Sequence, residues 1–195
     1  MAQTPILPPL PPLPPVGPTM ELVIVPDSLG SNDAFWLGYA TRSLVQSFES
    51  PLTGSITSVA VGLSKLRNPS ASINVNITSS LTDPFGINQG IISPGSVTSS
   101  SYLNPTWVSI RFPSPITVVK GSTYYLRLSV PTADRLNFYK WSTNNTNPYP
   151  YGMFYQGSLI KTASDGLAKI YIQGETVSSG VLSVLLNAST PGAHL

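Results

Sequence analysis

Residues able to carry out acid–base, nucleophilic or metal chemistry are few in this sequence and stand far apart. The 195 residues include no cysteine and one histidine, His194, next to the C-terminal residue. Most catalytic triads and transition-metal sites cannot be built from this set. The acidic residues are spread singly, without the carboxylate pair of a glycosidase or the D-x-D spacing of a Ca²⁺ loop: Glu21, Asp27, Asp33, Glu49, Asp83, Asp134, Asp165 and Glu175. We therefore predict a protein that is not an enzyme and uses no cofactor or metal.

The balance of charge excludes further classes of protein. Charged residues make up only 9% of the chain, and 10 Lys+Arg against 8 Asp+Glu give a net charge of +2. A nucleic-acid-binding protein needs clustered basic residues, whereas here they are scattered, so we expect no nucleic-acid partner. No run of 18 apolar residues occurs, so we expect no membrane span. A hydrophobic content of 41% argues against a disordered chain.

A surface with so few charges requires an explanation, because monomers ordinarily stay soluble through a mixed charged surface. Residues 1–20 and 84–110 carry no charge, and 176–195 carry none apart from His194. We expect neighbouring subunits or sugars to cover such a surface. Three N-x-S/T sequons supply candidate glycosylation sites, at Asn76, Asn144 and Asn187. Asn144, in a polar loop, is the best of them, although such triplets also arise by chance in a chain rich in Ser, Thr and Asn.

Residues 1–19 form a proline-rich arm. Eight of the 20 prolines lie between residues 5 and 18, and residues 7–16 follow a three-residue repeat. This pattern predicts an extended polyproline II rod with three residues per turn, about 40 Å long. One edge of the rod collects the large apolar side chains: Leu7, Leu10, Leu13 and Val16. Such an edge favours docking on a neighbouring copy or a carrier particle; the alternatives are a semi-rigid linker and an SH3-type ligand.

Residues 20–195 are predicted to form one β-domain. Short apolar or alternating runs recur between Gly, Pro, Asn and Ser turn signals, and no window shows a helical stripe. The predicted strands are Glu21–Val25, Ala34–Tyr39, Ser43–Glu49, Ser55–Leu63, Ser72–Thr78, Thr106–Phe112, Ile116–Lys120, Thr123–Val130, Leu136–Trp141, Gly152–Tyr155, Leu167–Gln173 and Val181–Leu186. This number of short strands favours an all-β fold, a single jelly-roll-like antiparallel β-sandwich with the extended proline-rich arm at its N-terminus.

The order of several strand-and-turn motifs resembles a known family. The motifs are Gln46–Pro51 with Gly54–Val59, then Thr106–Phe112, Pro115–Val118, Lys120–Leu128, Phe138–Trp141, Tyr151-Gly152 and Ser164–Ile170. Over residues 42–173 the chain resembles the choice-of-anchor R type of β-sandwich. That resemblance implies a fold like the carbohydrate-binding jelly rolls, found in prokaryotic surface proteins and in structural proteins of archaeal viruses. It implies no catalytic residues. Family members on cells carry a signal peptide and a C-terminal anchor, and we expect neither here.

Both ends of the β-domain contain uncharged or nearly uncharged strand-like segments. Residues 20–25 include Leu22 and Ile24, and the predicted C-terminal strand, residues 180–187, includes Val181, Val184 and Leu186. Each segment could complete the sheet of its own domain. A free strand of this kind is otherwise an aggregation hazard, and proteins often use one for strand addition to a partner. Passing such a segment to the next copy builds a filament when the rotation does not close.

Aromatic residues concentrate between residues 138 and 155, which hold seven of the 18 aromatics. Aromatic faces beside Asn, Ser and Gln can stack on sugar rings, so Tyr139, Trp141, Tyr149 and Tyr151 are candidate sugar-stacking residues. The alternative is that most of them pack in the core.

Together these features predict a non-enzymatic structural subunit of an extracellular assembly, either a virion surface component or a pilus-like filament. Its expected partners are copies of itself, other capsid or surface proteins, and glycans. The alternative function is a carbohydrate-binding adhesin or receptor-binding module.

Overall fold

The computed structural model describes residues 17–83 and 90–175, and all of its regular structure apart from one 3₁₀ turn is β-strand. The first seven strands are β1 (Thr19–Val23), β2 (Asp33–Leu37), β3 (Ser43–Glu49), β4 (Gly54–Leu66), β5 (Ile73–Thr78), β6 (Gly90–Ile92) and β7 (Thr106–Val118). The others are β8 (Thr123–Ser129), β9 (Phe138–Asn144), β10 (Phe154–Gln156), β11 (Leu159–Lys161), β12 (Asp165–Gly166) and β13 (Ala168–Gly174). The 3₁₀ turn covers Pro94–Ser96.

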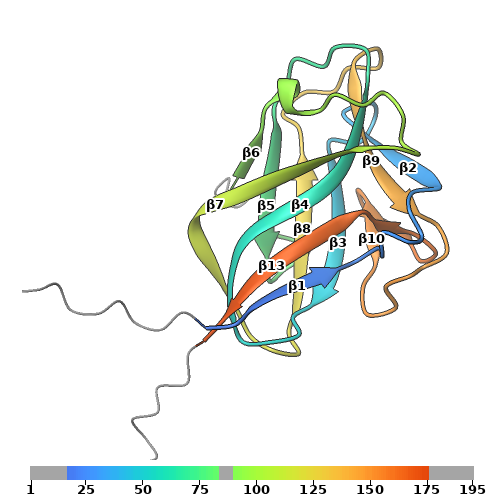
Figure 1. Cartoon of the computed structure of the whole chain (residues 1–195). Coiled ribbons are helices and arrows are strands. Elements are labelled where there is room, and N and C mark those ends of the chain that lie inside the picture. Colours follow the sequence, from blue (N-terminus) through green and yellow to red (C-terminus); the bar gives the residue numbers. More distant parts are fainter. Residues whose placement is uncertain (1–16, 84–89, 176–195) are drawn as a thin grey trace, which may run out of the picture.

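The strands form two antiparallel sheets that pack face to face as a β-sandwich (Figure 1). One sheet has seven strands, with the path β1-β13-β4-β9-β12, β7 on the free side of β4 and β2 on β9. The other has six strands in the order β11-β10-β3-β8-β5-β6. The chain repeatedly crosses between the sheets, since β2, β4, β7 and β9 lie in the first sheet and β3, β5, β8 and β10 in the second.

The core is produced by the alternation of apolar residues that the sequence displays. In β5 the residues Ile73, Val75 and Ile77 are buried, and in β8 so are Leu126 and Leu128. The outward neighbours Arg127 and Tyr125 are only half-buried. A single apolar cluster extends between the two sheets and includes Trp141, Phe48 and Phe154, each completely buried. Burial of these large side chains is the main stabilising contribution, about 1.5–3 kcal/mol for each apolar side chain.

Most predicted strands are present, and the differences have physical causes. Ser43–Glu49 has the predicted bounds, whereas Thr106–Phe112 and the first three residues of Ile116–Lys120 belong to the single strand β7, which ends at Val118. Its pairing with β4 shifts register between Ile56 and Ser58, across from Pro113 and Pro115. A β-bulge accommodates prolines that would otherwise end a strand. The sequence did not reveal β6, β11 and β12, because strands of two or three residues show no periodicity. The predicted strand Val181–Leu186 lies outside the described residues.

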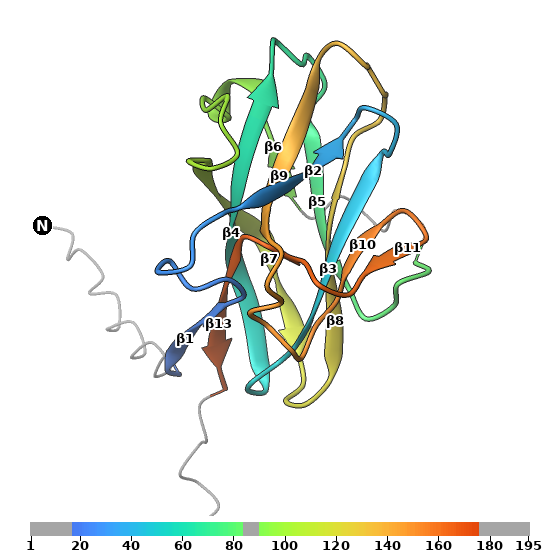
Figure 2. The same ribbon diagram turned by 90° about the vertical axis from the view of Figure 1, so that its right-hand side faces the viewer.

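The described chain begins and ends at one place (Figure 2). Gly17 is buried, and a side chain at that position would collide with the backbone of Gly174. The Gly174 N–H donates a hydrogen bond to the Pro18 carbonyl at 2.8 Å. Gly17 and Glu175, to which the two terminal segments attach, therefore lie close together, where β1 begins and β13 ends. In the described part of the chain, no helix is long and apolar enough to cross a membrane.

Candidate functional site

The described residues contain no cluster of side chains suited to holding a metal ion. No three His, Cys, Asp or Glu side chains there come close enough to hold a metal ion. His194 lies outside the described segments. Of the acidic residues, only Asp165 is completely buried, and its surroundings are those of a structural group.

The predicted sugar-stacking aromatics are mainly core residues. Trp141 is fully buried, and Tyr139 is 1% exposed, so neither offers a ring face to a ligand. Both lie on the inner face of β9, where the Trp141 Nε1–H donates to the Leu167 carbonyl and the Tyr139 hydroxyl donates to the Ala71 carbonyl. Burial raises the pKa of Tyr139 to about 12. For these two residues the sugar-stacking prediction is wrong, and the core alternative holds.

Tyr149 and Tyr151 differ from each other. Tyr149 is 8% exposed, and its hydroxyl accepts a hydrogen bond from the Glu49 N–H at 3.2 Å. Tyr151 is 70% exposed and meets the edge of the Tyr149 ring at 5.8 Å. Of the four candidate sugar-stacking residues, only Tyr151 therefore presents an open aromatic face.

Two of the candidate glycosylation sites are closed by the fold. Asn76 is 1% exposed and lies on β5 opposite Arg127. The Arg127 guanidinium donates a hydrogen bond to the Leu81 carbonyl at 2.7 Å and so fixes the segment that follows β5. Asn144 is 2% exposed at the end of β9, not in an open loop. An attached glycan needs an accessible amide, so both predictions are wrong for the folded domain. Asn187 lies outside the described residues.

A buried carboxylate organises the loop before β10. The sequence pattern Asp165-Gly166 predicts a turn, but Asp165 belongs to the short strand β12 and is fully buried. Its carboxylate accepts hydrogen bonds from Gln46 Nε2 at 3.0 Å and from the Tyr149 N–H at 2.9 Å. Desolvation raises the pKa of Asp165, while these hydrogen bonds oppose the rise. The Gln46 side chain completes the network, since its Oε1 accepts from the Gly166 N–H at 2.8 Å.

The strand edges are the second kind of candidate site, because an unpaired strand edge can add a strand from another chain. The outer strands of the six-stranded sheet, β6 and β11, have only three residues each as the structure describes them. On β2, the Asp33 carboxylate accepts the hydrogen bond of the Ala34 N–H at 2.7 Å, which occupies a donor of that edge. Two longer edges remain in the seven-stranded sheet, those of β1 and β7.

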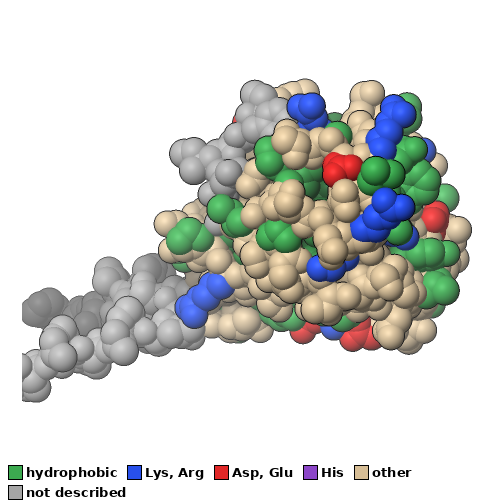
Figure 3. All heavy atoms as spheres, turned by 90° about the horizontal axis from the view of Figure 1, so that it is seen from above, with side chains coloured by type: hydrophobic (Ala, Val, Ile, Leu, Met, Phe, Trp, Pro, Cys, Tyr) green, Lys and Arg blue, Asp and Glu red, His purple; other side chains and the backbone are tan. Residues whose placement is uncertain are grey.

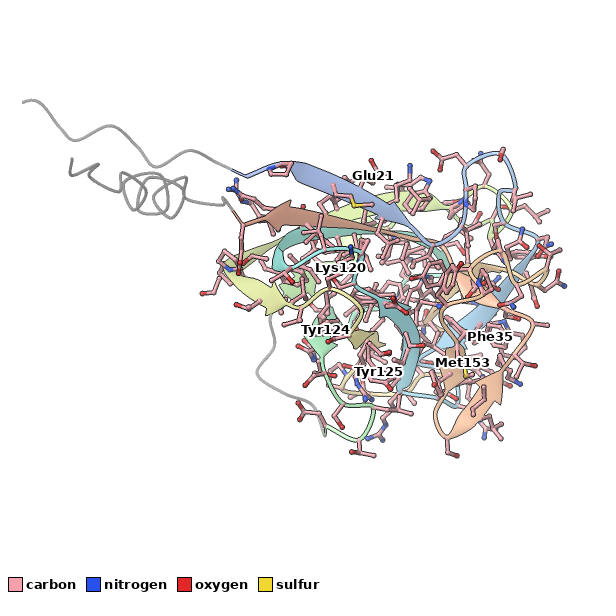
Figure 4. The ribbon with its side chains drawn as sticks, turned by 90° about the horizontal axis from the view of Figure 1, so that it is seen from below. Glu21, Phe35, Lys120, Tyr124, Tyr125 and Met153 are labelled. Atoms are coloured by element: carbon pink, nitrogen blue, oxygen red, sulfur yellow. The ribbon has the colours of Figure 1, made fainter. Side chains whose placement is uncertain are left out.

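β1 presents a regular open edge. Within the described chain it pairs only with β13, from Thr19 opposite Gln173 to Val23 opposite Lys169. The hydrogen bonds from Gly174 N–H to Pro18 and from Ile24 N–H to Ala168 show that the even-numbered residues bond toward β13. By the alternation of an antiparallel ladder, the N–H and C=O groups of Thr19, Glu21 and Val23 face away from it. Figure 4 shows Glu21 at this margin, on the opposite side of the sandwich from Tyr125.

The predicted assembly residues Leu22 and Ile24 belong to this region and take part in the chain's own sheet. Ile24 is completely buried, and Leu22 packs against the core. These two side chains therefore complete the chain's own domain, which is the alternative given above for residues 20–25. The outer backbone edge of β1 has no partner strand within the described chain. Leu7, Leu10, Leu13, Val16, Val181, Val184 and Leu186 lie outside the described residues.

The surface of the protein is sparsely charged, with charged residues making up only 9% of the chain. In the space-filling view, most of the visible side chains are uncharged (Figure 3). The ion pairs that join described residues form one group, in which Lys169 lies 2.8 Å from Asp27 and 3.7 Å from Glu21. The sandwich is thus held by apolar packing and hydrogen bonds. Comparison with known proteins adds no further information on the site, since neither a protein-family model nor a curated protein sequence matches this chain.

Proposed function

We propose that this protein is a non-enzymatic structural subunit of an extracellular assembly, either a virion surface component or a pilus-like filament. The observation that carries the proposal is the open β1 edge beside the point where both terminal segments connect to the sandwich. A terminal segment of one copy adds as an extra strand to β1 of the next copy. The strand donor is the segment containing Val181, Val184 and Leu186. The proline-rich arm lacks most of the backbone N–H groups that a strand needs, so it docks on the neighbouring copy through its apolar edge of Leu7, Leu10, Leu13 and Val16.

The charge of β1 favours a donor of this kind over a symmetric dimer. If β1 paired with its own copy in antiparallel register, with Thr19 opposite Val23, Glu21 would stand directly opposite Glu21. Like charges in that position destabilise a strand pair. Residues 1–20 and 180–187 contain no charged side chain, so neither segment meets this repulsion. A head-to-tail contact between unlike surfaces propagates as a filament or closes into a ring or shell.

Four further features support the proposal. A charged fraction of 9% suits a surface that neighbours cover, and the resemblance to choice-of-anchor R domains fits a surface or virion protein. The chain crosses repeatedly between the two sheets, as in the strand connectivity of a jelly roll, a fold that recurs in capsid and lectin domains. The scattered acidic residues support a role without catalysis or cofactor.

Deletion of each terminal segment tests the proposal. We compare the full chain with variants lacking residues 1–16 or residues 176–195, using electron microscopy and sedimentation velocity. The full chain is expected to form filaments or particles, and removal of the donor segment is expected to leave monomers with unchanged far-UV circular dichroism. Monomeric full-length protein at high concentration, or assembly that survives both deletions, would overturn the proposal.

A further inference from the structure

A pocket of about 340 Å³ opens where the segment joining β1 to β2 meets the start of β7. Its volume lies within the range of roughly 300–1,000 Å³ that small-molecule sites occupy. A second hollow, between Leu37 and Phe138, measures only about 60 Å³ and is too small for such a ligand. The larger pocket is lined by residues from distant parts of the sequence, among them Asp27, Leu103, Asn104, Trp107 and Lys169.

The indole of Trp107 provides a flat apolar surface in this pocket. Trp107 lies on β7 opposite Gly62 of β4, which has no side chain to cover it, and it is 39% exposed. The Lys169 ammonium lies over one face of the indole ring, 5.1 Å from its centre, so a ligand would stack on the part of the indole that this ammonium leaves exposed. Leu103, which is 60% exposed, and Pro105 extend the apolar lining. Exposed aromatic and aliphatic groups of this kind suit a ligand with one apolar face.

Hydrogen-bond donors and hydrogen-bond acceptors both lie beside the indole of Trp107. The Lys169 ammonium donates to Asp27 Oδ2 at 2.8 Å, and this hydrogen bond is the main cause that raises the pKa of Lys169 above 10.5. Glu21 Oε1 lies 3.7 Å from the same ammonium. One cation beside two carboxylates leaves no net positive charge for an anionic ligand. Asn104 adds an amide that can both donate and accept.

The wall between β1 and β2 is fixed before any ligand arrives. Gly30 has φ 58°, in the left-handed region that glycine adopts readily, and Leu29 N–H closes a turn onto the Pro26 carbonyl. The buried amide of Asn144 donates to the Gly30 carbonyl at 3.1 Å, and its Oδ1 accepts from the Thr146 N–H at 3.0 Å. Asn144 is therefore a positioning residue for the pocket.

The wall before β7 is held in a similar way. The Thr106 Oγ1 accepts hydrogen bonds from the N–H groups of Thr98 and Ser99, at 3.1 Å and 2.8 Å. The Ser99 hydroxyl donates to the Asn104 carbonyl at 2.7 Å. With both walls fixed by internal hydrogen bonds, a ligand does not have to order them, which lowers the entropic cost of binding.

We infer that this pocket binds a neutral pyranose sugar, stacked on Trp107 and hydrogen-bonded through its hydroxyls to Lys169, Asp27 and Asn104. A pyranose combines an apolar C–H face with a rim of hydroxyls that both donate and accept. The pocket offers the matching combination of an aromatic plane and a rim of donors and acceptors, in which the charges of the lining residues Lys169 and Asp27 balance each other. This inference is independent of the proposed assembly at the β1 edge, since it depends on the side chains of the pocket and not on strand pairing.

Titration with methyl glycosides of glucose, galactose and mannose tests the inference on the full chain. Saturable changes in tryptophan emission are expected for at least one of them, and Trp107→Ala should weaken binding by about tenfold or more, measured by calorimetry. Trp36→Ala is the matched control, because Trp36 is 46% exposed on β2 and does not line the pocket. The control should bind as the wild-type protein does.

A second variant protects the test against misfolding of Trp107→Ala. The Asp27 side chain is 68% exposed, so Asp27→Ala should keep the fold and still weaken sugar binding several-fold. The inference fails if none of the three glycosides binds, if Trp107→Ala binds as tightly as Trp36→Ala, or if only a carboxylate-bearing sugar binds. None of these outcomes would alter the deletion results that test assembly.

Discussion

β1 and β7 are two open edges of one sheet, and they differ in regularity. β7 exposes the outward backbone groups of Trp107, Ser109 and Arg111, but its ladder with β4 is interrupted by the bulge that holds Pro113 and Pro115. β1 has no proline between Thr19 and Val23 and no register shift against β13. Prolines and bulges are devices that prevent edge-to-edge association. Among residues 17–83 and 90–175, the sheet is thus protected at β7 and open at β1, where both terminal segments connect.

The largest expected effect comes from proline substitution at equivalent positions on the two edges. Glu21→Pro removes an N–H that faces away from β13, which an edge strand tolerates, and it blocks the bonding of an incoming strand. We expect the affinity between subunits to fall by about tenfold or more. Ser109→Pro removes an outward N–H from β7 and should leave assembly unchanged. Sedimentation velocity and electron microscopy measure both.

Glu21→Gln controls for the charge that Glu21→Pro also removes, because it keeps the N–H. It should assemble at least as well as the wild-type protein. If Ser109→Pro abolishes assembly and Glu21→Pro does not, β7 is the acceptor edge and the roles assigned to the two strands are reversed.

A change that lowers stability without touching either edge sharpens the comparison. In Asp165→Asn, the new amide N–H₂ faces either the Gln46 amide donor or the Tyr149 N–H, so a buried donor loses its acceptor. We expect the free energy of unfolding to fall by about 1–3 kcal/mol in urea denaturation. Assembly of the folded protein should persist. Loss of assembly in this variant would show that the effect of Glu21→Pro could arise from destabilisation alone.

The same variant has a defined pH signature. Because burial raises the folded-state pKa of Asp165 above 3.8, this carboxyl contributes its stability fully below 3.8 and loses it as pH rises through the raised value. Asp165→Asn does not titrate. The stability advantage of the wild-type protein over the variant should therefore grow as pH is lowered toward 3.8, and an advantage that shrinks over that range would contradict the sign of the shift.

The smallest expected effect is that of salt. If uncharged donor segments add to β1 mainly through backbone hydrogen bonds and apolar contacts, subunit affinity should change little between low and high ionic strength. Light scattering across a NaCl series measures this. A steep loss of assembly with salt would indicate that ion pairs, such as those of Lys169, hold the subunits together.

The fold was more predictable from the sequence than the sites. Alternation in β5 and β8 is a local property that burial on one face imposes, and it placed those strands correctly. The turn predicted at Asp165-Gly166 failed because the partner that buries the carboxylate, Gln46, is 119 positions away. The alternation of Lys140 with Tyr139 and Trp141 is the local signal that could have placed both aromatics on the buried face of their strand. The sequence did not indicate Trp107 as a binding residue, because its pocket is formed by segments that are distant in the sequence.

The buried amide of Asn144 has a consequence for making this protein in a eukaryotic secretory pathway. Glycosyltransfer acts on the emerging chain before folding, and Asn144-Asn145-Thr146 is then an accessible acceptor. The buried site beside the Gly30 carbonyl has no room for a glycan on Asn144, so a chain modified there could not reach the native fold. The yield of secreted protein would therefore depend on how often the transferase misses this asparagine, and a cytoplasmic or bacterial host avoids the loss.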